Sequence, residues 1–316
     1  MSLSETQQQY IDMILNEKHN RTPYDYLFRN TGESYPKSTH IALELPGIFK
    51  NTENTPIFTL NGRSLQQDLL ESVMPDHDTL FEEATYDLEH MSYFIDPDKM
   101  EVFYQCKNST IKKHGTPCII YVITNINYKT KDIIHYINNE AFSIRIIYIS
   151  QEKIDKILNT ISSRDYSKEE LSELDMVRLI HCLIFANKKH SKRVVKKVAE
   201  IFVGIKKIKH QHHLDLHLAL KTMIKYQFQD DIKEQEVLLE MISGVMSDEE
   251  LEELSTFDYR TKKYEIKIEE RDAIIEEAEK TLKEKDRFIE ETEKTLKEKD
   301  EEIEKLKFQL NELRAK

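Results

Sequence analysis

The sequence predicts an α/β domain followed by a helical region and a C-terminal coiled coil. Strand-like runs rich in aromatic and β-branched residues are concentrated between residues 87 and 150. Apolar residues at helical spacing then run from 171 to 246, and a seven-residue repeat covers the end of the 316-residue chain. We therefore expect an α/β domain at residues 1–155, a helical region at 156–258 and a coiled coil at 261–316.

Four strands are expected in the sheet. Residues 87–95 and 100–107 are joined by a segment with one proline and two aspartates, which predicts a hairpin. Residues 117–124 are almost continuously apolar, as a strand covered on both faces should be. A short helix at 131–140 and a fourth strand at 142–149 follow. The strand-helix-strand order favours parallel pairing with a right-handed crossover.

A compact polar group is expected where the first two strands meet. Alternation along the second strand places Glu101, Gln105 and Lys107 on one face, and Asp87 opens the strand predicted to pair with it. Hard oxygen ligands suit a divalent ion, and a lysine can orient water or neutralise charge that develops on a phosphate. The alternative is that Gln-x-Lys arises by chance and that Asp87 only begins a strand.

The order helix, hairpin, strand, helix, strand, with an aspartate near the first strand and an acid-x-Lys position on the second, resembles the PD-(D/E)XK superfamily. Within that superfamily, the chain is similar to the recombination-promoting nuclease, or transposase-like, group over roughly residues 20–245. The resemblance implies a restriction-endonuclease-like mixed sheet flanked by helices, and Mg²⁺-dependent hydrolysis of DNA phosphodiesters. Asp87 matches the metal-binding aspartate, Gln105 the acidic position and Lys107 the lysine.

The chain departs from that family at the acidic position, where Gln105 stands in place of Glu or Asp. A neutral amide is a weaker metal ligand than a carboxylate, which puts Mg²⁺ binding and activity in doubt. Glu83, on a predicted helix just upstream, and Glu101, on the face of Gln105, are the residues expected to supply the missing charge. The competing prediction is a non-enzymatic interaction protein on a degenerate nuclease fold, in which the coiled coil is the functional part.

Shorter elements are expected before the sheet. Helical spacing and capping residues predict helices, and two β-branched runs predict short strands that the sequence alone does not place in the sheet. The predicted helices are residues 4–17, 24–28, 64–72 and 79–84, and the predicted strands are residues 39–45 and 56–60.

The helical region contains a basic run. Between residues 188 and 209, nine positive side chains stand against one acid, Glu200. Such a run suits sequence-independent contacts with a phosphate backbone, so DNA is the expected partner. The alternative is a solvated helix face that complements acidic neighbours. The predicted nucleic-acid contacts are Lys188, Lys189, Lys192, Arg193, Lys196, Lys197, Lys206 and Lys207.

Four histidines follow in the sequence His210-Gln-His-His-Leu-Asp-Leu-His217. His213 and His217 are four residues apart, so they would point the same way on a helix and could hold a metal. No glutamate lies between them in the His-Glu-x-x-His order that is typical of a metalloprotease. A surface cluster at the start of a helix is therefore the favoured interpretation.

Apolar residues recur every seven positions through the tail. Placed at heptad position a, they leave position d apolar mainly at Leu306 and Leu313. This pattern predicts self-association through a coiled coil, most simply a parallel dimer, and the alternative is a single helix held by Glu–Lys pairs. The residues at position a are Ile268, Ile275, Leu282, Ile289, Leu296, Ile303 and Leu310.

Composition limits the remaining classes of function. A net charge of −12 argues against a protein that coats DNA generally, so any nucleic-acid contact must be local. Three cysteines, Cys106, Cys118 and Cys182, at unrelated spacings predict buried reduced thiols without a disulfide or a zinc site. No signal-peptide pattern or apolar run near ~18 residues is present. A cytoplasmic protein that does not span a membrane is expected.

Overall fold

The computed structural model describes residues 23–53, 57–60, 63–66, 69–75, 83–137, 140–166 and 168–252. The chain divides into two compact units, Met1–Ser255 and Thr256–Lys316, and all the residues described here belong to the first. The helix predicted at 4–17 and the coiled coil predicted at 261–316 lie outside the described residues. None of the described helices is both long and apolar enough to cross a membrane.

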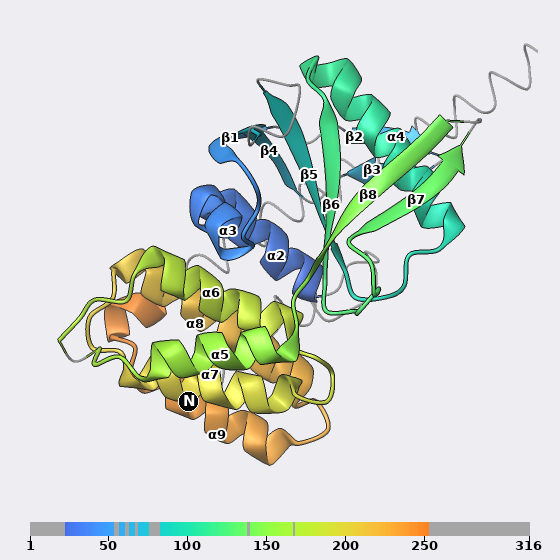
Figure 1. The fold of residues 1–316 in the computed structure, drawn as a ribbon. Helices are drawn as coiled ribbons and strands as arrows, with labels where there is room; N and C mark the ends of the chain where they lie inside the picture. The colour runs from blue at the N-terminus through green and yellow to red at the C-terminus, as the bar shows by residue number, and fades with distance from the viewer. Residues whose placement is uncertain are drawn as a thin grey trace, which may run out of the picture. The chain divides into compact units, whose positions relative to one another are not determined.

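A mixed six-stranded sheet confirms the prediction of an α/β fold with helices on the sheet (Figure 1). Strands β5, β6 and β8 are parallel, whereas β1 and β7 at the two edges and β4 pair antiparallel with their neighbours. A separate antiparallel pair joins β2 (Ile57–Leu60) to β3 (Arg63–Gln66). In sheet order the six strands are β1 (Ile48–Glu53), β4 (Leu69–Met74), β5 (Ala84–Met91), β6 (Cys118–Thr124), β8 (Glu140–Tyr148) and β7 (Asp132–Ile137).

The predicted strand at 100–107 is wrong, because these residues lie inside helix α4 (Pro97–His114). The Asp96 side chain accepts a hydrogen bond from the Lys99 backbone N–H and caps the helix, with Pro97 in its first turn. Gly115, at φ +74°, ends the helix in the left-handed conformation. The aspartates and proline thus start a helix that connects parallel strands β5 and β6, and they do not form a hairpin turn.

The predicted helix at 131–140 is also wrong. Residues 132–137 form edge strand β7, where exposed and less exposed side chains alternate as strand geometry requires. The apolar runs at 117–124 and 142–149 correspond to β6 and β8, and their parallel pairing is confirmed. Before the sheet, the predicted strand at 39–45 overlaps α3 (Pro36–Ala42), and the predicted helix at 64–72 falls on β3 and β4.

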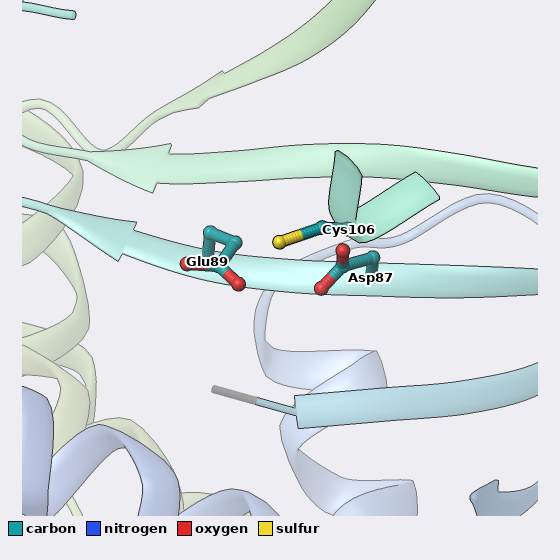
Figure 2. Close-up of side chains that lie close together, drawn as sticks. All are labelled: Asp87, Glu89 and Cys106. Atoms are coloured by element: carbon teal, nitrogen blue, oxygen red, sulfur yellow. The ribbon is translucent and has the colours of Figure 1, made fainter. Parts of the chain in front are cut away.

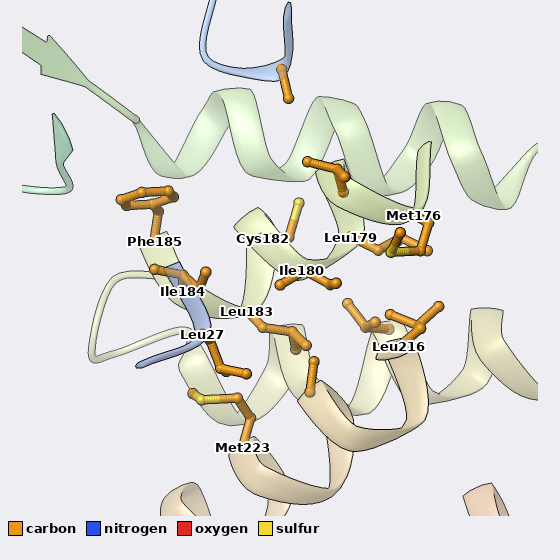
Figure 3. Close-up of a cluster of buried hydrophobic side chains, with 14 of the residues drawn as sticks. Leu27, Met176, Leu179, Ile180, Cys182, Leu183, Ile184, Phe185, Leu216 and Met223 are labelled. Atoms are coloured by element: carbon orange, nitrogen blue, oxygen red, sulfur yellow. The ribbon is translucent and has the colours of Figure 1, made fainter. Parts of the chain in front are cut away.

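Helices cover the two faces of the sheet differently. Helix α4 packs on one face, where Phe103 and Cys106 meet apolar residues of β6 and β8. On the other face, Tyr86 and Leu88 of β5 share a core with α2 (Pro23–Ser34), α3 and the later helices. Almost every side chain of α6 is buried in this larger core (Figure 3). The later helices are α5 (Gln151–Ser162), α6 (Glu173–Phe185), α7 (Ser191–Gly204), α8 (His210–Gln227) and α9 (Ile232–Ser243).

The first described helices are tied to α8 by hydrogen bonds between residues far apart in the sequence. The Tyr35 hydroxyl donates to the carboxylate of Asp215, 180 residues away. The side-chain amide of Gln227 donates to the Tyr24 hydroxyl across a separation of 203 residues. Helix α2 therefore reaches its final neighbours only when α6 and α8 are in place.

Candidate metal centre

Two carboxylates and one thiol meet between β5 and α4. Asp87 and Glu89 are two residues apart on β5, so both point to the face covered by α4, and Cys106 reaches them from that helix. Their ligand atoms all lie within 4.8 Å of one another (Figure 2). Within the described part of the chain, no other group of three histidine, cysteine or acidic side chains meets that distance. We call these three residues the acid–thiol cluster.

The position of Cys106 follows from the apolar stripe of α4. Met100, Phe103, Cys106 and Thr110 are the buried residues of this helix, at spacings of three and four. This stripe faces the sheet, so the thiol is held against β5. The exposed fractions of Asp87, Glu89 and Cys106 are only 0%, 5% and 3%.

Negative charge accumulates around the cluster. Burial, followed by the charges of Glu89 and Asp87, raises the pKa of the Cys106 thiol. Burial and the charge of Asp87 also raise the pKa of Cys118 on β6, while the ammonium of Lys107 acts in the opposite direction. Lys99 Nζ lies 3.9 Å from Glu89 Oε2. A divalent cation bound to both carboxylates would lower the thiol pKa and offset the repulsion between like charges.

The structure places only Asp87 of the predicted metal-binding residues in this cluster. Gln105 lies on α4, and its Nε2 donates to Glu101 Oε1 at 3.1 Å, so these two residues contact each other along the helix. Lys107 Nζ lies over the Phe142 ring, 5.5 Å from its centroid. Glu83 precedes β5, where Ser72 and Lys50 hydrogen-bond to its carboxylate and lower its pKa. Because 100–107 is not a strand, the predicted common face of Glu101, Gln105 and Lys107 does not exist.

Two cluster residues were missed by sequence reasoning. Glu89 follows Asp87 at the spacing that puts two side chains on one strand face, so the acid-x-acid pattern was a usable signal. Cys106 had no comparable signal, because the strand assignment put it on the face opposite Gln105. Only the helical assignment brings it towards β5.

The predicted basic run covers α7 and the segments beside it, and several of its side chains form ion pairs with acidic residues of the fold. Arg193 contacts Asp155 at 2.7 Å, Lys196 contacts Glu234 at 2.6 Å and Lys197 contacts Glu200 at 3.4 Å. Lys192 and Lys196 also lie over the Phe228 ring, and Lys207 donates to the Lys168 carbonyl. Lys188, Lys189 and Lys206 are exposed. The predicted DNA-binding residues are therefore partly engaged in contacts within the fold.

The predicted surface cluster of histidines is wrong for three of its members, because His212, His213 and His217 are buried. His213 Nδ1 lies 2.8 Å from Glu250 Oε1, and Glu250 is held by reciprocal hydrogen bonds with Ser247. Burial lowers the pKa of His217 to about 3, so this imidazole is neutral inside the core. The two histidines at this spacing are therefore part of the packed core, and His213 contacts Glu250.

A cleft of about 460 Å³ lies between α3, α5 and α6. Four of its charged residues form ion pairs, Lys153 with Glu44 at 2.8 Å and Arg178 with Asp175 at 3.5 Å, and Glu152 and Lys156 also line it. Neither the acid–thiol cluster nor Gln105 and Lys107 line it. The cleft is therefore separate from the candidate metal centre.

Comparison of the chain with protein-family models, with curated proteins and with solved structures finds no significant match. A functional assignment must therefore be based on the geometry of the acid–thiol cluster and its surroundings.

Proposed function

We propose that the protein is a metal-dependent phosphodiesterase that acts on nucleic acid, with its metal centre at Asp87, Glu89 and Cys106. The observation that carries this proposal is the meeting, within 4.8 Å, of two buried carboxylates on an inner strand of a mixed sheet and a thiol on the helix that covers it. Buried like charges are costly unless a cation accompanies them, and such arrangements are concentrated at functional sites. Of the motif that carried the resemblance to the restriction-endonuclease-like superfamily, only Asp87 keeps its expected place on a strand, because Gln105 and Lys107 lie on helix α4.

The residues have distinct proposed roles. The oxygens of Asp87 and Glu89 would hold Mg²⁺, and Glu89 would take the acidic role that the sequence suggested for Gln105. A metal bound there would supply an activated water and polarise the phosphate. Lys107, which lies on α4 and acts to lower the pKa of Cys118 on β6, is assigned the role of offsetting charge that develops on the phosphate. The thiol of Cys106 adds affinity for softer ions such as Zn²⁺ and Co²⁺.

The test is cleavage of plasmid DNA with Mg²⁺, Mn²⁺, Co²⁺ or Zn²⁺. Asp87→Asn and Glu89→Gln are expected to abolish metal-dependent cleavage, since each removes a carboxylate ligand, and Lys107→Ala to weaken it. Gln105→Glu is the matched control, because residue 105 contacts Glu101 outside the cluster, and its activity should stay at the wild-type level. Equal cleavage by wild type and Glu89→Gln would defeat the assignment.

A second candidate function is a non-enzymatic, self-associating interaction protein. The observation that favours it is the burial of the cluster, because exposed fractions of 0–5% leave no room for a phosphodiester unless α4 moves. The ion pairs of Arg193, Lys196 and Lys197 also reduce the charge available to DNA. This function predicts that metal ions raise the melting temperature without producing cleavage, and that wild type and Lys188→Ala/Lys189→Ala bind DNA equally weakly.

A further inference from the structure

Strand β7 exposes a flat apolar edge. It is the last strand of the sheet and pairs with β8 over six residues without a shift in register. Ile134 is 62% exposed and Tyr136 is 72% exposed, both on the face away from α4. Their partners on β8, Ser143 and Ala141, are small and exposed, so the surface beside them is flat.

The two edges of the sheet differ in their protection against pairing. Strand β1 contains an irregularity between Phe49 and Asn51, and its polar sequence includes Lys50. Bulges and lysines are the usual devices that stop an edge strand from pairing with another chain. From residue 133 to 137, β7 has no bulge, proline or formal charge. Strand β7 is therefore the edge prepared to accept another strand.

We propose that β7 pairs antiparallel with β7 of a second copy of this chain, about a two-fold axis at His135. Residues directly opposite in a continuous sheet must lie on the same face, which limits a two-fold pairing to axes that pass through a residue. With the axis at His135, Ile134 faces Tyr136 of the second copy and Ile133 faces its Ile137. Aromatic–aliphatic and aliphatic pairs of this kind are favourable across strands.

Two properties of the chain identify the second copy as the partner. The net charge of −12 makes two copies repel over most of their surface, but residues 133–137 are neutral and present no such repulsion. The heptad repeat of the tail predicts that copies associate through residues 261–316, and a tethered partner raises the effective concentration at β7. The interface at β7 is additional to the coiled coil and independent of the proposed reaction.

Cysteine cross-linking in the full chain tests this register. Opposite Cα atoms in an antiparallel pair lie within the range that a disulfide spans, so His135→Cys should form a covalent dimer under mild oxidation. Thr52→Cys, exposed on β1, is the matched control, because the tail tethers both variants equally. The natural cysteines are buried and stay unreactive. We expect His135→Cys to cross-link roughly tenfold faster than Thr52→Cys.

A lysine at the edge tests the same interface in a second way. Ile134→Lys in the His135→Cys background places two charges at the edge of β7 and should reduce cross-linking to the Thr52→Cys rate. Ser143→Lys, one strand further in on the same face, is the control and should keep most of the cross-linking. Circular dichroism checks that each variant is folded. Equal rates for His135→Cys and Thr52→Cys, or no effect of Ile134→Lys, would overturn the proposal.

Discussion

Acidic side chains have different neighbours on the two faces of β4 and β5. On the face covered by α2 and α3, His40 Nδ1 lies 2.8 Å from Glu71 Oε2, and His90 Nδ1 lies 2.6 Å from Asp25 Oδ1. Each acid on that face has a histidine beside it. On the face covered by α4, Asp87 and Glu89 stand together with a thiol, and Lys99 is 3.9 Å from Glu89.

This difference distinguishes acids that are paired with histidines from the two neighbouring acids for which a function is proposed. A buried acid next to a histidine is an ordinary solution to the cost of desolvation, because the pair shares a proton or an ion pair. Two acids together increase that cost unless a cation binds. Histidines lie beside the acids on one face and Lys99 lies beside Glu89 on the other, so the acid–thiol cluster differs in bringing two carboxylates together.

The largest expected effect on stability comes from removing the histidine of the His40–Glu71 pair. His40→Leu leaves the carboxylate of Glu71 buried without its histidine, and we expect a loss of about 3–5 kcal/mol in the free energy of unfolding, measured by urea denaturation. The double variant His40→Leu/Glu71→Leu should recover most of this loss, because both polar groups are then removed. A loss of less than about 1 kcal/mol in the single variant would show that the pair is dispensable.

Acidification should lower the free energy of unfolding through a buried histidine on the same side of the sheet. Burial lowers the pKa of His181, which packs against Phe28 and Phe185, to about 3. Between pH 6.5 and 3, His181 is therefore protonated in the unfolded chain but not in the folded chain. Stability that is present at neutral pH is lost as the pH falls through this range. The slope is about 1.4 kcal/mol per pH unit for this histidine.

His181→Leu should flatten that dependence by one proton in urea titrations at pH 6.0, 5.0 and 4.0. Burial also lowers the pKa of His217 to about 3. His217→Leu should therefore reduce the pH dependence of stability independently. If neither His181→Leu nor His217→Leu changes the slope, the two imidazoles are charged in the folded protein.

Removing a charge from the acid–thiol cluster should raise the free energy of unfolding, whereas removing His40 on the other face should lower it. Without metal, Glu89→Gln removes one of two neighbouring charges, and we expect stability to rise by on the order of 1 kcal/mol. The increase in melting temperature that Mn²⁺ gives the wild type should disappear in this variant. Scanning calorimetry with and without Mn²⁺ measures both quantities, and a destabilised Glu89→Gln protein would contradict the comparison.

The smallest effect is expected at the surface. Lys197 and Glu200 form an exposed ion pair at 3.4 Å, and Lys197→Ala should change the free energy of unfolding by less than about 0.5 kcal/mol. Urea denaturation at low and high salt measures this change. A larger loss would mean that exposed charges matter as much as the buried pairs do.

The sequence was informative where one pattern had one physical meaning. The continuous apolar run of β6 predicted a buried parallel strand because helices cover such a strand on both faces. Buried and exposed side chains alternate along most of β8, so only one of its faces is covered. Residues 97–114 were misassigned because their aromatic and β-branched residues favour strands, while the capping by Asp96 and Gly115 favours a helix. Local capping and packing against the sheet decided the outcome.

The site was less predictable than the fold. Asp87 was identified from its position at a strand, but Cys106 joins it only through the packing of α4 on β5, and sequence spacing does not encode that contact. Strand β7 was mistaken for a helix because its short apolar run fits either period.

The long-range bonds of Tyr24 and Tyr35 have a consequence for biosynthesis. Their partners, Gln227 and Asp215, emerge from the ribosome about 200 residues later, so the first helices must wait through most of translation before they can dock. Until α6 and α8 have emerged, the sides of α2 and α3 that pack on these helices are open to solvent, and a nascent chain of this kind is a natural client for chaperones.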